Sequence, residues 1–299
     1  MKRSTVTVAL LSLLLGTLLP TTSNSEARKE SDVVYGVLSG LSLVMDVYHP
    51  PVPLRRGVVL IPGSGWDGRE RGYTDWQLKN GDSYINPLRD ALVDSGFTVF
   101  VPNTRMAPEH RFPAPVDDVR RAVRFIRFHA ARFGIEPDPI GAVGHSTGGH
   151  LAAMAGVLDD DPDLQQSRLP EEHASSRVQA VVTIASPHDL TVNTALLWAF
   201  TVSFLGERAP MDESFTEYKR EGIYAEASTV THVTPDDAAF MLIHGTGDAN
   251  VTFKQLPIMA DAVRGAGLPL KVVEIESDSH APPLNHSEIA DWIKGQLGE

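Results

Sequence analysis

A serine at position 146 lies within the pattern Gly-x-Ser-x-Gly, which occupies residues 144–148. The apolar run 140–143 precedes it, and a run of small, mostly apolar residues, 149–158, follows it. A buried strand that turns sharply into a helix holds such a serine in a strained conformation and projects its hydroxyl from the sheet edge. The pattern therefore predicts that Ser146 is the nucleophile of an acyl-transfer reaction.

A serine hydroxyl becomes a good nucleophile when an imidazole accepts its proton and a carboxylate orients that imidazole. Asp248 ends the turn after the apolar run 239–244, and His280 ends the loop after the run 270–275. The carboxyl ends of parallel strands lie along one edge of a sheet. We therefore expect Ser146, Asp248 and His280 to meet there as a catalytic triad.

Each partner of the serine has an alternative in the sequence. Asp189 follows the preceding apolar run and is the other candidate acid, while His286 lies at the start of the last helix and is the reserve base. His145, directly before the nucleophile, is expected to pack beside the site.

An acyl-transfer site also needs hydrogen-bond donors for the oxyanion that develops in the transition state. The backbone N–H of Thr147 is one candidate, because a helix N-terminus directs free N–H groups and positive dipole toward an anion. A second donor is expected from the loop 62–66, where small residues let the N–H groups of Ser64, Gly65 or Trp66 face the cavity.

The elements that position these residues alternate between strands and helices. Apolar runs without polar alternation indicate strands buried on both faces, hence a mostly parallel sheet covered by helices. The first two strands are close in sequence and are expected to form an antiparallel hairpin. The predicted strands are residues 32–36, 41–47, 57–61, 98–101, 141–143, 178–184, 239–244 and 270–275, and the predicted helices are 85–95, 115–133, 149–158, 253–265 and one that Asn285 and Glu288 cap.

Two segments interrupt this alternation. Residues 159–176 are polar and acidic and predict a surface loop, whereas 190–231 mix aromatic and charged residues. The second segment is a possible cap insertion that contributes to a substrate pocket, or its aromatic side chains fill a local core. Trp66, His145 and Trp198 are the candidate pocket residues.

The N-terminal residues 1–27 have the pattern of a secretory signal peptide, with a basic start at Lys2 and Arg3, an apolar stretch, and small residues before a cleavage site after Ala27. Removing them changes the net charge from −12 to −13 by loss of Lys2, Arg3 and Glu26. We therefore expect a secreted or periplasmic protein whose mature domain is residues 28–299. An uncleaved membrane anchor is the alternative.

Composition limits the partners that this chain can have. Its negative charge disfavours nucleic acid and anionic membranes as partners. The arginines 120, 121, 124 and 127 are expected to form a solvated helix face. The chain has no cysteine, so the core must stabilise it without disulfides. No histidine pair has the spacing of a zinc protease, and we expect neither a metal nor a cofactor.

The chain resembles α/β-hydrolases of the esterase/lipase group, close to the hormone-sensitive-lipase-like esterases and the bacterial feruloyl and acetyl-xylan esterase-like branch. Besides the serine turn, residues 34–50, 103–118 and 244–251 carry this resemblance. One departure lies in the oxyanion loop, where the family usually shows His-Gly-Gly-Gly-Trp and this chain has Pro62 and Ser64 in place of the histidine and the middle glycine. Arg105 and Glu109 are expected to form a buried ion pair.

The resemblance implies the α/β-hydrolase fold and a serine esterase that forms an acyl-enzyme on Ser146. Its substrates would be short-chain, acetyl or aryl esters, either small molecules or groups on a polysaccharide. Two alternatives stay open at this point. An amidase or peptidase would use the same three side chains, and a binding protein without catalysis would use only the fold.

Overall fold

The fold was analysed in a computed structural model that describes residues 27–67, 79, 83–192, 194–207 and 222–298. The predicted signal peptide, apart from Ala27, lies outside the described residues. Residues 193 and 208–221 of the possible cap insertion also lie outside them.

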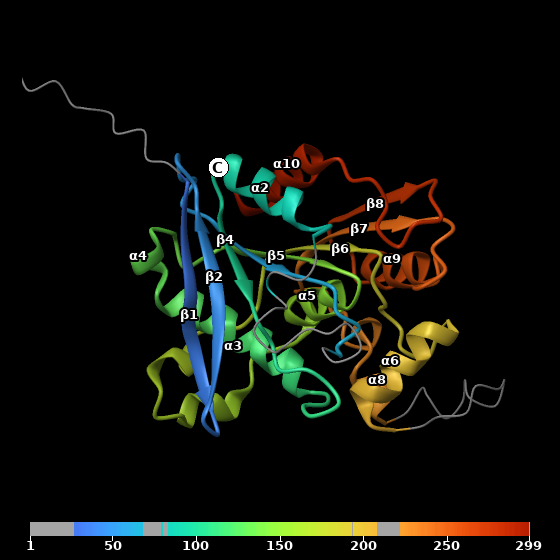
Figure 1. The fold of residues 1–299 in the computed structure, drawn as a ribbon, viewed down its shortest axis with the longest axis horizontal. Helices are drawn as coiled ribbons and strands as arrows, with labels where there is room; N and C mark the ends of the chain where they lie inside the picture. The colour runs from blue at the N-terminus through green and yellow to red at the C-terminus, as the bar shows by residue number, and fades with distance from the viewer. Residues whose placement is uncertain (1–26, 68–78, 80–82, 193, 208–221, 299) are drawn as a thin grey trace, which may run out of the picture.

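A single eight-stranded sheet crosses the molecule in the order β1-β2-β4-β3-β5-β6-β7-β8 (Figure 1). The β1–β2 and β2–β4 pairs are antiparallel, and every other neighbouring pair is parallel. The prediction of a mostly parallel eight-stranded sheet with an antiparallel hairpin at its edge is confirmed. The strands are β1 (Arg28–Leu38), β2 (Leu41–His49), β3 (Gly57–Ile61), β4 (Thr98–Pro102), β5 (Ile140–His145), β6 (Ala180–Ile184), β7 (Ala239–Gly245) and β8 (Leu270–Ile275).

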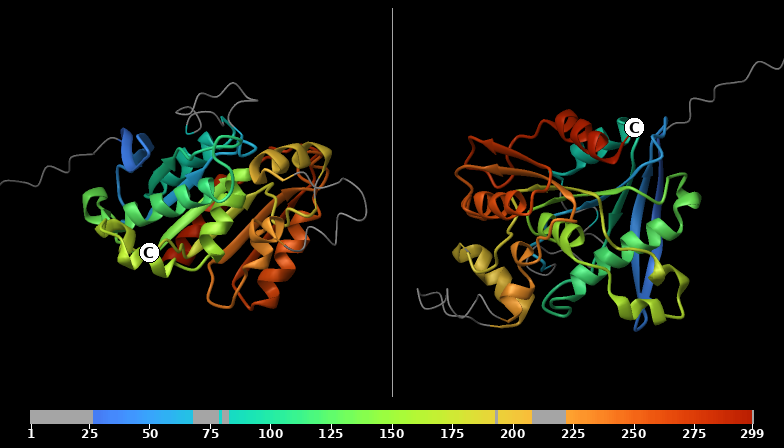
Figure 2. Two further views of the ribbon diagram at one scale, coloured as in Figure 1. Left: turned by 90° about the horizontal axis from the view of Figure 1, so that it is seen from below. Right: turned by 180° about the vertical axis from the view of Figure 1, so that it is seen from behind.

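Helices cover both faces of the sheet, as the views from below and from behind show (Figure 2). Helices α2 (Asn86–Asp94) and α10 (His286–Leu297) share one face. Helices α3 (Ala114–Phe128), α5 (Thr147–Val157) and α9 (Gln255–Gly265) lie on the other. Successive strand residues point to opposite faces, which produces two apolar cores on either side of the sheet.

The alternation within β3 shows how these two cores arise. Val58 and Leu60 pack in the core beneath α2 and α10, whereas Val59 and Ile61 pack in the core beneath α3 and α5. All five residues of β3 are buried. A strand that is buried on both faces must be apolar along its whole length.

Helix ends follow the local chemistry of the sequence. The predicted helix 115–133 divides at His129 into α3 and a short α4 (Ala130–Phe133), which ends at Gly134 in the left-handed conformation. The side chain of Asn285 accepts a hydrogen bond from the N–H of Glu288 and caps α10 as predicted.

Two short 3₁₀ turns, Pro162–Gln166 and Pro170–His173, lie within the predicted surface loop 159–176. The second turn packs on α3, and its Glu172 pairs with Arg121. Arg120 donates to the hydroxyl of Ser176, and Arg127 donates to the backbone carbonyls of Ser175 and Arg177, so the expected solvated arginine face is wrong. Arg124 is only 5% exposed and Arg127 only 8%. Burial and the neighbouring guanidinium groups lower the pKa of Arg124 to about 10.

The described part of the segment 190–231 contains α6 (Ala195–Leu205), α8 (Ile223–Glu226) and a 3₁₀ turn at Thr229–Thr231. Leu197, Phe204 and Leu205 of α6 are buried in the core on the α5 side of the sheet. Helix α6 therefore belongs to the same core as the sheet. No helix among the described residues has both the length and the apolar character needed to cross a membrane.

The expected ion pair between Arg105 and Glu109 is wrong, because Arg105 pairs with Asp118. The fully buried carboxylate of Asp118 accepts hydrogen bonds from the backbone N–H of Arg105 at 2.7 Å and from its guanidinium Nη2 at 2.8 Å. Glu109 is exposed. A carboxylate at the start of α3 can reach the loop before it, and this pair fixes that loop to the helix.

We predict that Asp118→Ala lowers the free energy of unfolding by about 3 kcal/mol, because the arginine loses the partner that compensates its partial burial. Asp138→Ala is the matched control, since Asp138 pairs with Arg127 through a carboxylate that is 62% exposed. An exposed carboxylate contributes less than about 1 kcal/mol. Urea denaturation of both variants measures the difference, and equal losses would contradict the prediction.

Candidate active site

Ser146 lies at the tip of the turn between β5 and α5, with φ of 55° and ψ of −126°. Residues other than glycine rarely adopt this conformation, so the turn is held by its surroundings. A Cβ on Gly148 would lie 2.2 Å from the carbonyl oxygen of Ile61, and one on Gly144 would lie 2.2 Å from that of Gly148. Both positions require glycine because backbone passes directly against them.

The structure brings Ser146, Asp248 and His280 together at the carboxyl edge of the sheet, near the ends of β5, β7 and β8. His280 Nε2 lies 2.9 Å from Ser146 Oγ, and His280 Nδ1 lies 2.7 Å from Asp248 Oδ2. Because a carboxylate only accepts, Nδ1 carries a proton and Nε2 is left to accept the serine proton. This geometry can convert the serine into a nucleophile.

The carboxylate of Asp248 is fully buried and strongly hydrogen-bonded. Its Oδ1 accepts from the backbone N–H groups of Asn250 at 2.8 Å and Val251 at 3.1 Å. Burial by itself raises the pKa of Asp248, but the hydrogen bonds from His244, His280 and the backbone outweigh it and hold that pKa well below its usual range. Asp248 therefore stays ionised while it orients His280.

The loop that carries His280 is anchored from two other elements. His145 Nε2 donates a hydrogen bond to the backbone carbonyl of His280 at 2.9 Å, and the hydroxyl of Tyr84 donates to the carbonyl of Pro282 at 2.5 Å. The rings of Tyr84 and His145 also pack against each other, with centroids 4.7 Å apart. His145 thus packs beside the site and supports the loop.

Neither alternative partner lies against the serine. The side chain of Asp189 accepts a hydrogen bond from the N–H of Thr191 at 2.8 Å and stabilises a turn after β6. His286 is the first residue of α10, which lies on the face of the sheet opposite α5. The contacts therefore favour Asp248 and His280 over these two residues.

The oxyanion loop differs from the expectation that its N–H groups face the cavity. The N–H groups of Ser64 and Gly65 point at the hydroxyl of Thr147, with N to Oγ1 distances of 3.1 and 3.0 Å, and that of Trp66 lies 3.4 Å away. The backbone N–H of Thr147 makes no hydrogen bond within the described part of the chain. It remains available to an anion beside Ser146, as predicted for a helix N-terminus.

Trp66 connects the oxyanion loop to the core. Its indole stacks on Phe204 with centroids 4.5 Å apart, and its Nε1–H donates to His150 Nδ1 at 3.2 Å. His150 Nε2 in turn donates to the carbonyl of Ala227 at 2.7 Å. These two hydrogen bonds fix one neutral tautomer of His150, and burial lowers its pKa to about 4.

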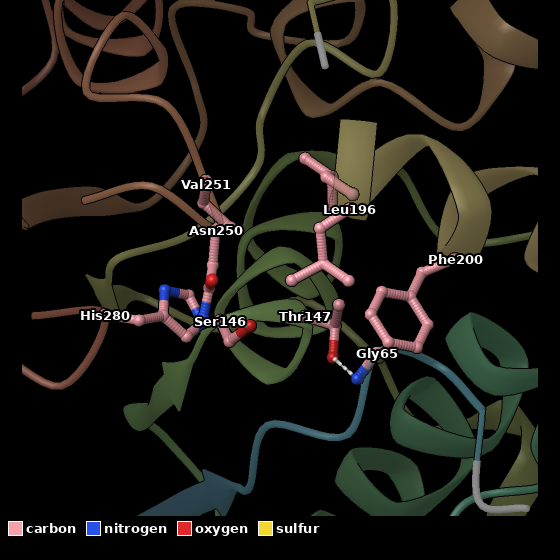
Figure 3. A pocket seen from close by; sticks show the side chains of 9 residues that line it. Gly65, Ser146, Thr147, Leu196, Phe200, Asn250, Val251 and His280 are labelled. Carbon is pink, nitrogen blue, oxygen red and sulfur yellow. Dashed lines mark hydrogen bonds between the residues drawn. The ribbon is translucent and has the colours of Figure 1, made fainter. Parts of the chain in front are cut away.

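A small cavity opens beside the serine between α5, α6 and the loop after β7 (Figure 3). Its volume is about 20 Å³, slightly more than the ~10–15 Å³ that one water needs. Phe200 presses on the oxyanion loop so closely that a Cβ on Gly65 would lie 2.8 Å from its ring. The lining residues are Gly65, Ser146, Thr147, Leu196, Leu197, Phe200, Asn250, Val251 and His280.

None of the three expected pocket residues lines this cavity. Trp66 is held in the core by Phe204 and His150. His145 faces the loop that carries His280. Trp198 is partly buried and packs against the core. The residues of α6 that line the cavity are Leu196, Leu197 and Phe200, so Trp198 lies on another side of this helix.

The apolar wall of the cavity was not predicted from the sequence. Leu196 and Phe200 are four residues apart and therefore share one face of a helix. This spacing could have predicted that the two side chains line the cavity together. However, α6 is apolar on almost every side, so the sequence does not distinguish the face that meets the cavity. Asn250 lies two residues after Asp248 in the predicted acid turn, which was a second usable signal.

The chain matches a protein-family model and curated relatives from Mycobacterium tuberculosis. The family model BD-FAE matches residues 45–263. "Probable carboxylic ester hydrolase LipM" of Mycobacterium tuberculosis is 30% identical over 84% of this chain and 56% of its own length. "Esterase LipQ" of the same organism is 30% identical over 85% and 58%. The chain thus spans just over half the length of these curated relatives.

Among solved structures, a truncated carbohydrate esterase from gut microbiota superposes with a TM-score of 0.73 at 24% identity, covering 93% of this chain and 99% of the other. This likeness concerns the fold. Together with the sheet order, it confirms the predicted α/β-hydrolase fold.

We predict that His150 makes the protein less stable in acid. Its pKa of about 4 in the folded state is lower than the ~6.5 of an unfolded chain, so the unfolded state binds a proton first as the pH falls. The stabilisation is complete above pH ~6.5 and is lost progressively toward pH ~4. His150→Gln should therefore lose about 2 kcal/mol less between pH 7 and pH 5 than wild type. Denaturation at both pH values tests this, and identical losses would count against it.

Proposed function

Because the chain belongs to the BD-FAE family of α/β-hydrolases, we propose that it is a carboxylic ester hydrolase that works through an acyl-enzyme on Ser146. The observation that carries this proposal is the continuous contact from Ser146 Oγ through His280 to Asp248, with distances of 2.9 and 2.7 Å. The matches to LipM and LipQ support the reaction class.

In the first half of the reaction Ser146 Oγ attacks the ester carbonyl while His280 Nε2 takes its proton. The tetrahedral oxyanion is stabilised by the N–H of Thr147 at the start of α5. His280 then gives the proton to the leaving alkoxide, the C–O bond breaks, and an alcohol departs. Asp248 holds the imidazole in the required tautomer and stabilises the imidazolium that forms.

In the second half, water replaces the alcohol. His280 takes a proton from this water, and the resulting hydroxide equivalent attacks the acyl-enzyme. Collapse of the second tetrahedral intermediate returns the proton from His280 to Ser146 Oγ and releases the carboxylic acid. Each proton that the imidazole accepts is therefore returned, and the enzyme ends unchanged.

The small cavity supports a preference for short acyl groups such as acetyl. The cavity is small, about 20 Å³, and Leu196 and Phe200 form part of its wall. The alcohol part of the substrate would lie on the solvent side, where His280 is partly exposed. An acetyl group on a small alcohol or on a polysaccharide fits this arrangement, and the carbohydrate esterase among the similar structures supports the second source.

We further propose that residues 1–27 direct export and that the mature enzyme acts in the periplasm or the medium. The basic start, the apolar stretch and the small residues before position 28 support this assignment.

We predict that a fluorophosphonate probe labels wild type and fails to label Ser146→Ala, and that this variant loses turnover of 4-nitrophenyl acetate by about 10⁴-fold or more. Ser287→Ala is the matched control, since Ser287 is exposed on α10. It should be labelled like wild type. Labelling of Ser146→Ala at the wild-type rate would reject Ser146 as the nucleophile.

We also predict that kcat/KM for 4-nitrophenyl esters decreases at least about 10-fold from acetyl to hexanoyl, because each unaccommodated methylene costs about 1–3 kcal/mol. Phe200→Ala should recover much of the loss for hexanoyl by widening the cavity. Phe128→Ala is the control, because Phe128 is 49% exposed on α3. A profile that rises with chain length in wild type would overturn the proposed short-acyl specificity.

A further inference from the structure

The hydroxyl of Thr147 occupies an unusual position in the site. Thr147 follows the nucleophile and is only 1% exposed. Its Oγ1 receives hydrogen bonds from three successive backbone N–H groups, those of Ser64 at 3.1 Å, Gly65 at 3.0 Å and, more weakly, Trp66 at 3.4 Å. In Figure 3 the Thr147 side chain lies between Ser146 and Phe200, with its hydroxyl directed at the oxyanion loop. The loop donors that would ordinarily meet a substrate therefore meet this hydroxyl.

A hydroxyl has one proton to donate and two lone pairs that accept. The two shorter of these bonds, from the N–H groups of Ser64 and Gly65, occupy both lone pairs of Oγ1. The proton of this hydroxyl has no acceptor among the described residues, and a buried donor without an acceptor is costly. Thr147 also lines the cavity beside Ser146, which is where a substrate would supply the acceptor.

Hydrogen bonds received by a hydroxyl polarise its own O–H bond, because chains of hydrogen bonds strengthen one another in a low dielectric. Two N–H donors on Oγ1 thus make its proton a stronger donor than that of an isolated threonine. In the same residue the backbone N–H stands at the start of α5 with no partner of its own in the described chain. Both donors of Thr147 can therefore serve one anion beside Ser146.

We propose that Thr147 is a catalytic residue whose side-chain hydroxyl donates a hydrogen bond to the oxyanion of the tetrahedral intermediate. The loop N–H groups of Ser64 and Gly65 then act through this hydroxyl, as positioning groups. This inference rests on the proposed ester hydrolysis. It assigns to one side chain the role that the loop backbone was expected to perform directly.

Three variants at this position test the proposal with 4-nitrophenyl acetate. Thr147→Val keeps the shape of the side chain without the hydroxyl, and its kcat should decrease about 100-fold with KM changed only a few-fold, as for loss of one oxyanion donor. Thr147→Ser keeps the hydroxyl and should retain kcat within about threefold of wild type. Thr147→Ala serves if the valine variant does not fold, and should lose at least about 10-fold.

A second measurement separates an oxyanion donor from a structural support. A trifluoromethyl ketone forms a charged tetrahedral adduct with the serine, so its inhibition constant should increase in parallel with the loss of kcat/KM across the variants. Thr98→Val is the matched control, since Thr98 is buried at the start of β4, at the opposite edge of the sheet. Its kinetics and inhibition should equal those of wild type.

The outcomes are distinguishable. A kcat in Thr147→Val or Thr147→Ala equal to or above that of wild type would overturn the proposal, because the hydroxyl would then merely obstruct the loop donors. Loss of kcat without weaker binding of the trifluoromethyl ketone would overturn it as well. Failure of ester hydrolysis itself would instead appear as absent turnover in both wild type and Thr98→Val.

Discussion

Ser146 occupies the tip of a turn that has backbone pressed against both of its flanks. The carbonyl of Ile61 at the end of β3 blocks any side chain at Gly148, and the carbonyl of Gly148 blocks one at Gly144. These contacts compensate the positive φ of Ser146 and fix α5 against the sheet. They also bring the loop after β3 within hydrogen-bonding distance of Thr147. One steric constraint thereby sets the conformation of Ser146, the start of α5 and the position of the loop 62–66.

The sheet and the three converging side chains could be predicted from sequence because each depends on a local signal. Strand β3 is apolar along its whole length, and Asp248 and His280 each end a turn after such a strand. Parallel topology then determines which ends meet. The partner of Arg105 could not be predicted in this way. Glu109 and Asp118 are both within reach along the chain, and only the path of the loop into α3 selects Asp118.

The lining of the cavity and the direction of the N–H groups in the oxyanion loop could not be predicted, because both are determined by side-chain packing between residues that are far apart in the sequence. Trp66 was expected to line the pocket, yet stacking on Phe204 and a hydrogen bond to His150 draw its ring into the core. The direction of the N–H groups of Ser64 and Gly65 depends on a threonine more than eighty residues later in the chain. Such contacts follow from three-dimensional proximity alone, which is why motif spacing located the site but not its lining.

His280 lies in a weakly protected part of the domain. Strand β8 is an edge strand without a single fully buried residue, and most of the loop that follows is at least partly exposed. Elements of this kind open locally at low free energy. Three contacts from better packed regions oppose this tendency: Asp248 holds the imidazole, His145 holds the backbone carbonyl of His280, and Tyr84 holds that of Pro282. Since His145 ends the central strand β5 and Asp248 follows β7 in the turn after it, the rigidity of the sheet is transmitted to His280, which the core does not itself enclose.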